Sequence, residues 1–241
     1  RPMMANDVSM DDVRDLTEQH YQSFLQARLA GAKALARLDA AMQARHALLP
    51  MPMTLRELAL LPQLRDASLL ALASSPHSAH WSRDDIGDTD PAQVLAGDAA
   101  YADFSRRILE EAARHLEAIH AGQLPYVADA AFATADTGIL ARAARVASYR
   151  DDGWFAPVIA TLLPQACVAP GTANSAPSQS LAMALGHGVE TIPTQASLEA
   201  LRTALDQVRH AGIRKKLERN LKPAEKALRA RSALAGLIAV S

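Results

Sequence analysis

Histidine and glutamate side chains that could bind a metal or move protons are grouped around residues 111–120. Glu117 and His120 have the Glu-x-x-His spacing that places both side chains on one helix face, and Glu111 precedes His115 by four residues. Ferritin-like di-metal sites need two such motifs and further carboxylates on facing helices. No other histidine of this chain has a glutamate three residues before it. The pattern therefore favours an exposed polar helix face, with a helical enzyme or metal site as the alternative.

A second group of possible metal ligands lies in a polar stretch of the sequence. His77 and His80 are followed by Trp81, Asp84 and Asp85. Imidazole and carboxylate groups together can hold zinc or another divalent ion. No cysteine accompanies them and the aspartates follow in a turn-like run, so we expect a solvated loop.

The single cysteine, Cys167, lies among apolar neighbours near the end of an expected helix. A lone cysteine excludes an internal disulfide and fits a reducing, cytoplasmic location. A catalytic thiol needs a nearby base, which the sequence does not place. The chain also lacks a Gly-x-Ser-x-Gly elbow and a glycine-rich phosphate loop. The sequence thus predicts no catalytic residue, no metal site and no cofactor.

The composition favours helices as the elements that position these groups. The chain has 241 residues, of which 49% are hydrophobic but only 4% aromatic. Alanine and leucine dominate the apolar fraction, and both residue types favour helices over strands. No apolar run approaches the roughly 18 residues needed to cross a bilayer, so we expect no membrane association. The sequence predicts an all-α protein.

Helical periodicity, capping residues and prolines divide the chain into segments. Pro62 is expected to break or kink one helix, the Gly186–Gly188 segment to form a turn, and Pro223 to kink or restart another helix. The polar stretch 75–98 suggests a boundary, so we expect an N-terminal helical subdomain over residues 1–95 and a helical-repeat subdomain over residues 96–241. Helices are predicted over 9–49, 54–61, 66–74, 99–120, 137–149, 154–166, 196–210 and 213–231. A further short helix is expected to end at residue 185, and another is expected to begin near residue 125.

A resemblance to a known repeat class is carried by segments of the second half. These segments are Gly138–Val146, Trp154–Leu163, Ser180–Gly186, Leu198–Leu205 and Val208–Glu218. Residues 137–231 resemble the degenerate HEAT-type repeats of large bacterial proteins in the WGR-domain, molybdate-regulator-like group. The resemblance implies antiparallel helix pairs that form an α-solenoid or irregular bundle with a scaffolding role. It assigns no catalytic residue, and the termini of the chain also suggest a region of a longer protein.

Basic residues are concentrated in the last part of the sequence. Residues 202–231 contain ten basic and three acidic residues, a net charge of +7, so the rest of the chain carries −8 of the total of −1. Such asymmetry can mark a surface for an acidic partner or for nucleic acid. It can equally be a solvated face that pairs with acidic helices of the same chain. The candidate binding residues are Arg214, Lys215, Arg219, Lys222, Lys226 and Arg229.

Three functions follow from these features. We expect a non-enzymatic protein–protein interaction or scaffolding module that binds an acidic partner through the basic face. Weak nucleic-acid binding through the same face is the first alternative, although residues 156–241 include no aromatic side chain for base stacking. A helical enzyme or ligand site around residues 111–120 is the second.

Overall fold

A computed structural model of the chain describes residues 53–74 and 90–238. Every element in these two ranges is helical and neither range contains a strand, which confirms the all-α prediction. None of the described helices combines the length and apolar character needed to cross a bilayer. The segment containing His77, His80, Asp84 and Asp85 and the first predicted helix lie outside the described residues.

The chain divides into two compact units, and each is considered by itself. Residues 1–51 and 55–63 make up the first unit, and residues 52–54 and 64–241 make up the second. The described part of the first unit holds most of helix α2 (Met53–Leu60) and the short 3-10 helix η1 (Leu61–Gln63). Helix α2 ends two residues before Pro62, which confirms the predicted break.

The second unit contains the remaining helices. These are α3 (Asp66–Ser74), α4 (Pro91–Ala96), α5 (Ala99–His120), α6 (Thr134–Arg150), α7 (Phe155–Cys167), α8 (Gln179–Thr191), α9 (Gln195–Gln207) and α10 (Ala211–Ile238). Helices α3 and α4 therefore belong to the same unit as the later helices, whereas the sequence placed residues 64–95 in an N-terminal subdomain. Asp98 shows why, because its carboxylate accepts hydrogen bonds from Ser68 Oγ at 2.7 Å and from the backbone N–H of Arg65 at 3.1 Å.

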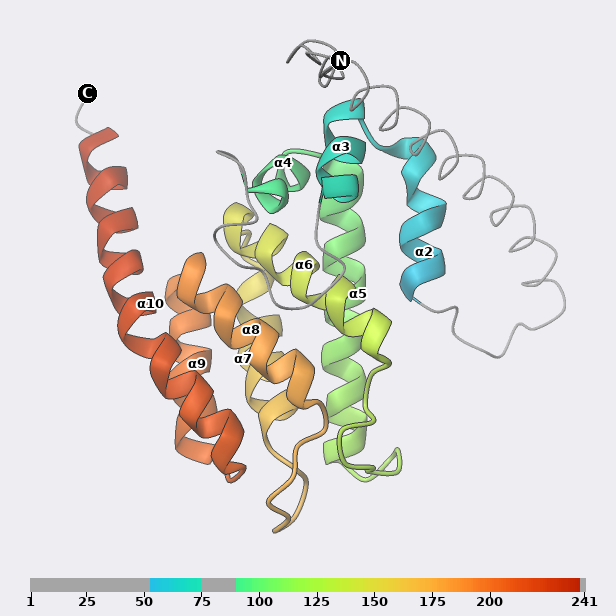
Figure 1. The fold of residues 1–241 in the computed structure, drawn as a ribbon, viewed down its shortest axis with the longest axis vertical. Helices are drawn as coiled ribbons and strands as arrows, with labels where there is room; N and C mark the ends of the chain where they lie inside the picture. Colours follow the sequence, from blue (N-terminus) through green and yellow to red (C-terminus); the bar gives the residue numbers. More distant parts are fainter. Residues whose placement is uncertain (1–52, 75–89, 239–241) are drawn as a thin grey trace, which may run out of the picture. The chain divides into compact units, whose positions relative to one another are not determined.

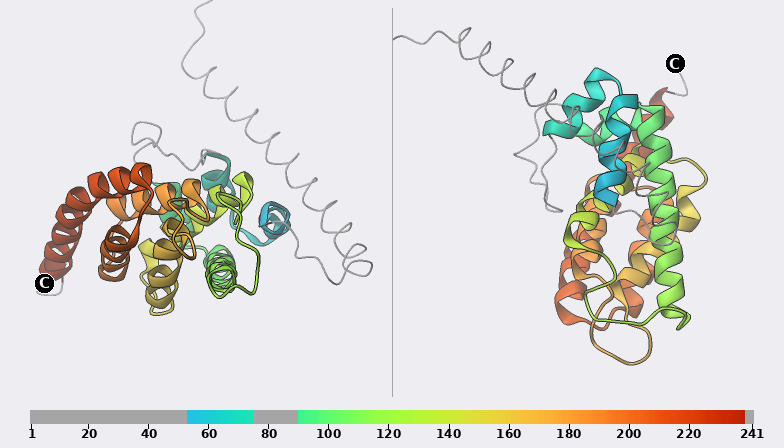
Figure 2. Two further views of the ribbon diagram at one scale, coloured as in Figure 1. Left: turned by 90° about the horizontal axis from the view of Figure 1, so that it is seen from below. Right: turned by 90° about the vertical axis from the view of Figure 1, so that its right-hand side faces the viewer.

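Helices α5 to α10 of the second unit are arranged in two layers (Figures 1 and 2). Helix α7 packs between α5 and α9 in one layer, and α8 packs between α6 and α10 in the other. Consecutive helices α5–α6, α7–α8 and α9–α10 join the layers in pairs. The core between them is aliphatic, and its fully buried side chains include Leu140, Ile159, Leu162, Leu181 and Leu201. This arrangement leaves α10 with one face on α8 and α9 and the opposite face on the surface.

Local signals explain most helix ends. Asp98 caps α5 by accepting a hydrogen bond from Ala100 N–H at 3.1 Å. Gly122 follows the end of α5 with a φ of +71°, the left-handed conformation that glycine adopts without strain. Thr194 and Ser197 cap α9 reciprocally, since each side chain accepts a hydrogen bond from the other residue's backbone N–H.

Three local predictions were wrong. The predicted turn at Gly186–Gly188 does not exist, because α8 continues through both glycines to Thr191. No helix begins near residue 125: residues 121–133 form a loop that is tied to the next loop by Asp129 N–H and Ala131 N–H, which donate to the carbonyls of Ala176 and Pro177. Of the two outcomes expected at Pro223, a kink or a restart, the restart is wrong, because α10 continues through the proline to Ile238.

Candidate functional site

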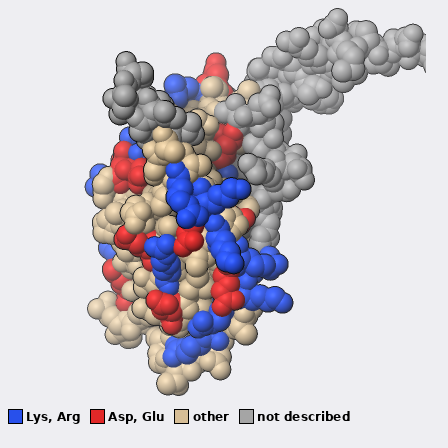
Figure 3. Space-filling view, turned by 90° about the vertical axis from the view of Figure 1, so that its left-hand side faces the viewer, with Lys and Arg blue, Asp and Glu red and all other residues tan. Residues whose placement is uncertain are grey.

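Helix α10 has a buried face and an exposed face, and the exposed face carries the predicted binding residues. Ile213, Leu217, Asn220 and Ala224 are buried against the layers beneath. The six predicted basic residues are all exposed: Arg214, Lys215, Arg219, Lys222, Lys226 and Arg229. The face of the molecule on the α10 side shows many Lys and Arg side chains, with acidic side chains between and beside them (Figure 3).

Five of these residues form a single row. Lys215, Arg219, Lys222, Lys226 and Arg229 follow one another at alternating steps of four and three, which keeps them on one side of a helix. We call this row the basic stripe. At 1.5 Å per residue it extends for about 21 Å along α10. Within the described part of the chain, no carboxylate lies within ion-pair distance of any member of the stripe.

Arg214, the sixth predicted residue, has a different role. Its guanidinium donates a hydrogen bond of 2.7 Å to the carbonyl oxygen of Val208, the residue that follows α9. Carbonyl groups at the end of a helix lack intrahelical donors, so this contact satisfies one of them. The spacing already leaves Arg214 outside the row, one position before Lys215, but its contact with Val208 could not be predicted, because that contact depends on how α10 folds back on α9.

Polar contacts position α10 on the neighbouring helices. Asn220 Nδ2 donates to Glu190 Oε2 on α8 at 2.7 Å, and Arg202 on α9 pairs with Glu225 at 2.7 Å. Glu225 is therefore already engaged with a cation of the chain. These contacts fix the rotation of α10 about its axis, so the basic stripe faces away from α8 and α9.

Arg231 belongs to the basic segment of the sequence but binds inward. Its guanidinium donates to the carbonyl oxygens of Ser148 at 3.2 Å and Pro193 at 3.1 Å, with a longer contact to the carbonyl of Tyr149. Ser148 and Tyr149 are in the last turn of α6, where the helix dipole favours a cation. Arg231 thus anchors the second half of α10, and its charge does not contribute to the stripe.

The group on α5 does not assemble a metal site. His115 Nε2 lies 3.0 Å from the carbonyl oxygen of Ala131, and His120 Nε2 lies 3.1 Å from the carbonyl oxygen of Gln165. A protonated ring nitrogen donates a hydrogen bond at each place, so the two histidines hold different segments against α5. In the ranges 53–74 and 90–238, no group of three or more His, Cys, Asp or Glu side chains could hold a metal ion.

Cys167 lies at the end of α7 and is completely buried. Burial raises the pKa of the thiol to about 12. The nucleophilic form of cysteine is the thiolate, so this residue does not present a reactive sulfur at neutral pH.

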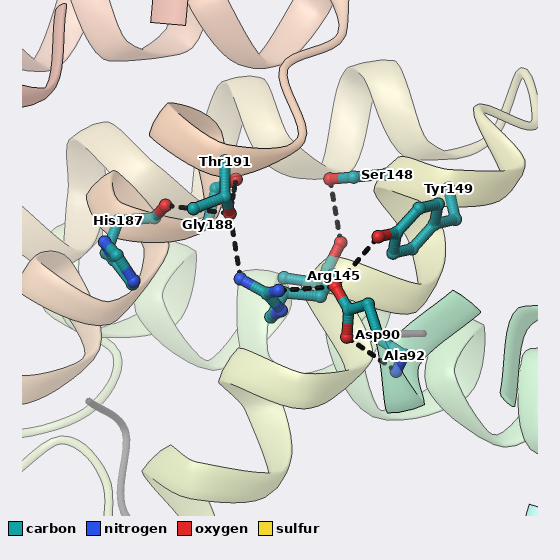
Figure 4. Close-up of polar contacts among 9 residues, drawn as sticks. Asp90, Ala92, Arg145, Ser148, Tyr149, His187, Gly188 and Thr191 are labelled. Carbon is teal, nitrogen blue, oxygen red and sulfur yellow. Dashed lines mark hydrogen bonds and ion pairs between the residues drawn. The ribbon is translucent and has the colours of Figure 1, made fainter. Parts of the chain in front are cut away.

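A partly buried polar network joins α4, α6 and α8, and it was not predicted from the sequence (Figure 4). Arg145 on α6 pairs with Asp90 Oδ2 at 2.5 Å and donates to Thr191 Oγ1 at 2.8 Å. Tyr149 Oη donates to the same Asp90 oxygen at 2.8 Å, while Asp90 Oδ1 caps α4 through the N–H of Ala92. Burial raises the pKa of Tyr149, and its hydrogen bond to Asp90 adds to this effect. The network stabilises the junction of three helices.

A sequence signal for this network existed. Arg142 and Arg145 interrupt an otherwise apolar run from Ile139 to Ala147, and such arginines need buried partners if the run is a core helix. Arg142 meets that need in part by donating to Tyr101 Oη at 2.9 Å. The identity of the partners could not be read from the sequence, because Tyr101 and Asp90 are far away in the chain.

Comparisons with protein-family models, with curated proteins and with solved structures find no match to this chain.

Proposed function

We propose that this chain is a helical-repeat interaction module that binds an acidic surface of a protein partner through the basic stripe of α10. The paired helices in two layers and the resemblance of residues 137–231 to HEAT-type repeats support a scaffolding role within a larger bacterial protein. Repeat proteins of this kind bind partners along extended helical surfaces.

The proposal depends chiefly on one observation: the stripe is a row of exposed cations without carboxylate partners among the described residues. The chain as a whole carries a formal charge of −1, so the row is not a by-product of a generally basic protein. Like charges at steps of three and four repel one another along a helix, which makes the row slightly unfavourable for folding. An acidic partner would relieve that repulsion.

The exposed side of α9 is also compatible with a free surface at this end of the layers. Its exposed residues include Gln195, Glu199, Thr203, Asp206 and Gln207. Terminal repeats of helical arrays carry such polar outer faces, whereas internal repeats present apolar faces to their neighbours. The α9–α10 pair therefore fits a terminal position with an accessible outer face.

A binding assay with a simple acidic polymer tests the proposal. The probe is fluorescent poly-L-glutamate, titrated with the purified chain at ~50 mM salt, where screening is modest. Reversal of three stripe charges by Lys215→Glu, Lys222→Glu and Lys226→Glu should weaken binding about tenfold or more, since each change replaces attraction by repulsion.

The control carries the same change of charge elsewhere. Arg106, Arg107 and Arg114 are exposed on α5, so their replacement by glutamate gives a variant of equal net charge with an intact stripe. Its affinity for the polymer should stay within about twofold of that of the unaltered chain, because charges outside the stripe act on the polymer only through a weak long-range field. Equal losses in the two triple variants, or no binding of the polymer by the unaltered chain, would refute the proposal.

The same assay distinguishes nucleic-acid binding. Phosphate contacts release condensed counterions, so log affinity falls linearly with log salt concentration. Labelled duplex DNA should bind more weakly than poly-L-glutamate at equal salt. If DNA bound more tightly than the polymer and this binding depended on the stripe, the ligand would be nucleic acid and not an acidic protein.

A further inference from the structure

One end of the second unit carries almost no charge. It consists of the loop 121–133, which joins α5 to α6, and the loop 168–178, which joins α7 to α8 (Figure 1). We call these two loops together the neutral end. Asp129 is its single charged residue, and no Asp, Glu, Lys or Arg occurs from residue 153 to residue 189. Charged residues make up 21% of the chain and lie mostly on protein surfaces, so a surface without them is unexpected.

The neutral end also exposes apolar side chains. Three large hydrophobic residues are exposed in the described part of the chain, and two of them, Leu124 and Val127, lie in the loop 121–133. Val127 is the most exposed of the three, at 61%. Pro125 and Ala128 beside them are exposed as well. Apolar side chains that gather on one surface, rather than being scattered singly, mark sites of interaction.

Hydrogen bonds hold the exposed loop in one conformation. Tyr126 Oη and Ser175 Oγ share a hydrogen bond of 2.6 Å, which ties the loop 121–133 to the loop 168–178. The backbone N–H of Asp129 donates to the carbonyl oxygen of Ala176 at 2.9 Å, and its carboxylate accepts from Gln179 N–H at 2.8 Å. The one charge of the neutral end is therefore already engaged at the start of α8, where the helix dipole favours an anion. A loop fixed in this way loses little conformational entropy when it binds.

The neutral end is large enough for a weak interface between proteins. Twenty residues of the two loops are exposed or partly exposed, and a standard interface takes about 20–30 residues from each side. Charged residues are depleted in the centre of such interfaces, whereas the rim is polar. Arg209 fits the rim, because its guanidinium donates to the carbonyl oxygen of Ala169 at 2.7 Å. An interface at the lower end of the size range predicts a dissociation constant in the micromolar range.

From these observations we infer that the neutral end binds a second copy of the chain through a twofold-symmetric interface. The same surface of each copy meets the other in such an interface, so charges at its centre would repel one another. The neutral end avoids this repulsion, and the formal charge of −1 leaves little long-range repulsion between whole chains. A dimer carries two basic stripes, which raises its apparent affinity for a partner with two acidic surfaces. The inference is independent of the proposed function, because the neutral end and the basic stripe share no residue.

Sedimentation equilibrium of the purified full chain tests the inference. The unaltered chain should dimerise with a dissociation constant in the micromolar range. Val127→Asp should raise this constant about tenfold or more, because twofold symmetry places the new charge in the interface twice. Leu70→Asp on α3 is the matched control. Leu70 is 49% exposed but lies outside the neutral end, so this variant should dimerise like the unaltered chain.

A substitution in the second loop tests whether both loops take part. Ala173 is exposed in the loop 168–178, and Ala173→Asp should raise the dissociation constant by a similar factor. Because both substituted side chains are exposed, the circular dichroism spectra of the variants should match that of the unaltered chain. Normal dimerisation of Ala173→Asp would overturn the interface formed by the two loops.

Salt separates this interface from association through the basic stripe. Raising the salt concentration from ~50 mM to ~0.5 M screens exposed charges but leaves apolar contacts in place. The dissociation constant of the dimer should change by less than about twofold, both in this titration and in the triple variant Lys215→Glu, Lys222→Glu and Lys226→Glu.

Three results would overturn the inference. These are a chain that stays monomeric up to roughly 0.1 mM, a dimer that dissociates in salt or in the triple variant, and equal losses for Val127→Asp and Leu70→Asp. The binding of poly-L-glutamate by the stripe is measured separately, so these results would leave the proposed function standing.

Discussion

Gly186 on α8 lies so close to Leu217 on α10 that a Cβ atom at position 186 would be 2.4 Å from Leu217 Cδ2. Leu217 is fully buried, so its side chain has little room to move aside. The glycine that seemed to mark a turn is therefore a point of close approach between two helices. This close contact positions α10, the helix that carries the basic stripe, against α8.

Gly186→Ala should consequently destabilise the protein. Overpacking of a buried site costs about 1–3 kcal/mol, whereas replacing a helical glycine by alanine gains at most about 1 kcal/mol. In a Leu217→Ala background the clash is gone, and the same substitution should become stabilising. Chemical denaturation of the four proteins of this double-mutant cycle measures the change of sign.

The neighbouring glycine of α8 provides a control. A Cβ atom at Gly188 would meet only Arg145 Cγ, at an ordinary distance of 3.8 Å. Gly188→Ala should therefore raise the free energy of unfolding by about 0.5–1 kcal/mol. Similar effects of both alanines would show that helix propensity alone governs this helix.

The network around Asp90 makes a second prediction. Asp90→Asn keeps a residue able to cap α4 but removes the charge that faces Arg145. Loss of one member of a buried ion pair typically destabilises by about 3 kcal/mol or more. We expect a decrease of that size in the free energy of unfolding, measured by urea denaturation at neutral pH.

An exposed ion pair of the same helix junction gives the comparison. Asp152 lies 2.6 Å from Arg150, and both side chains are 37% exposed. Exposed pairs contribute about 0–1 kcal/mol. Asp152→Asn should therefore cost far less than Asp90→Asn, and equal costs would argue against burial as the source of the effect.

Much of the fold could be predicted from sequence because its signals are local. Helix α5 was predicted at its observed bounds, since the apolar periodicity and Gly122 are signals that act within a few residues. Gly186 misled the prediction because its reason for being glycine is Leu217, thirty-one residues away. Helix α4 was missed altogether, because it is short and begins within a polar stretch.

The candidate site, like the fold, could be predicted only where the signals are local in the sequence. The steps between Lys215 and Arg229 place the stripe on one face without any knowledge of tertiary structure. Which basic residues bind carbonyl groups of the chain itself could not be predicted, because Arg214 contacts Val208 after α9 and Arg231 contacts Ser148 on α6. Charge counts over a segment therefore overstate the charge available to a partner.

Asp98 predicts a dependence of stability on acid pH. Its burial acts to raise the pKa of the carboxyl group, but hydrogen bonds from Ser68 and from the N–H groups of Arg65 and Ala100 outweigh this and lower it. A carboxyl group with a lowered pKa stabilises the folded state above its unfolded pKa, near 4, and loses this contribution as the pH falls through the folded value. The difference in stability between the unaltered chain and Asp98→Asn should be constant from about pH 6 to 8 and shrink below about pH 4.

Asp103→Asn is the matched control for this titration. Asp103 lies on the surface of the same helix, 3.4 Å from Arg107, with its side chain 64% exposed. The substitution should change stability by less than about 1 kcal/mol throughout the pH range. If the difference in stability between the unaltered chain and Asp98→Asn grew as the pH fell, its sign would be wrong, and Asp98 would not be a stabilising carboxylate.

Arg231 predicts a local effect at the end of α10. Arg231→Lys keeps the charge but removes the planar fork that reaches the carbonyls of Ser148 and Pro193 together. Amide hydrogen exchange should become faster in α10 beyond residue 224, with little change in the half that is held by Leu217 and Asn220. Arg229→Lys, on the exposed stripe, should leave exchange unchanged. If the two substitutions accelerated exchange equally, or if Arg231→Lys unfolded the whole helix, Arg231 would not be the separate anchor of this second half.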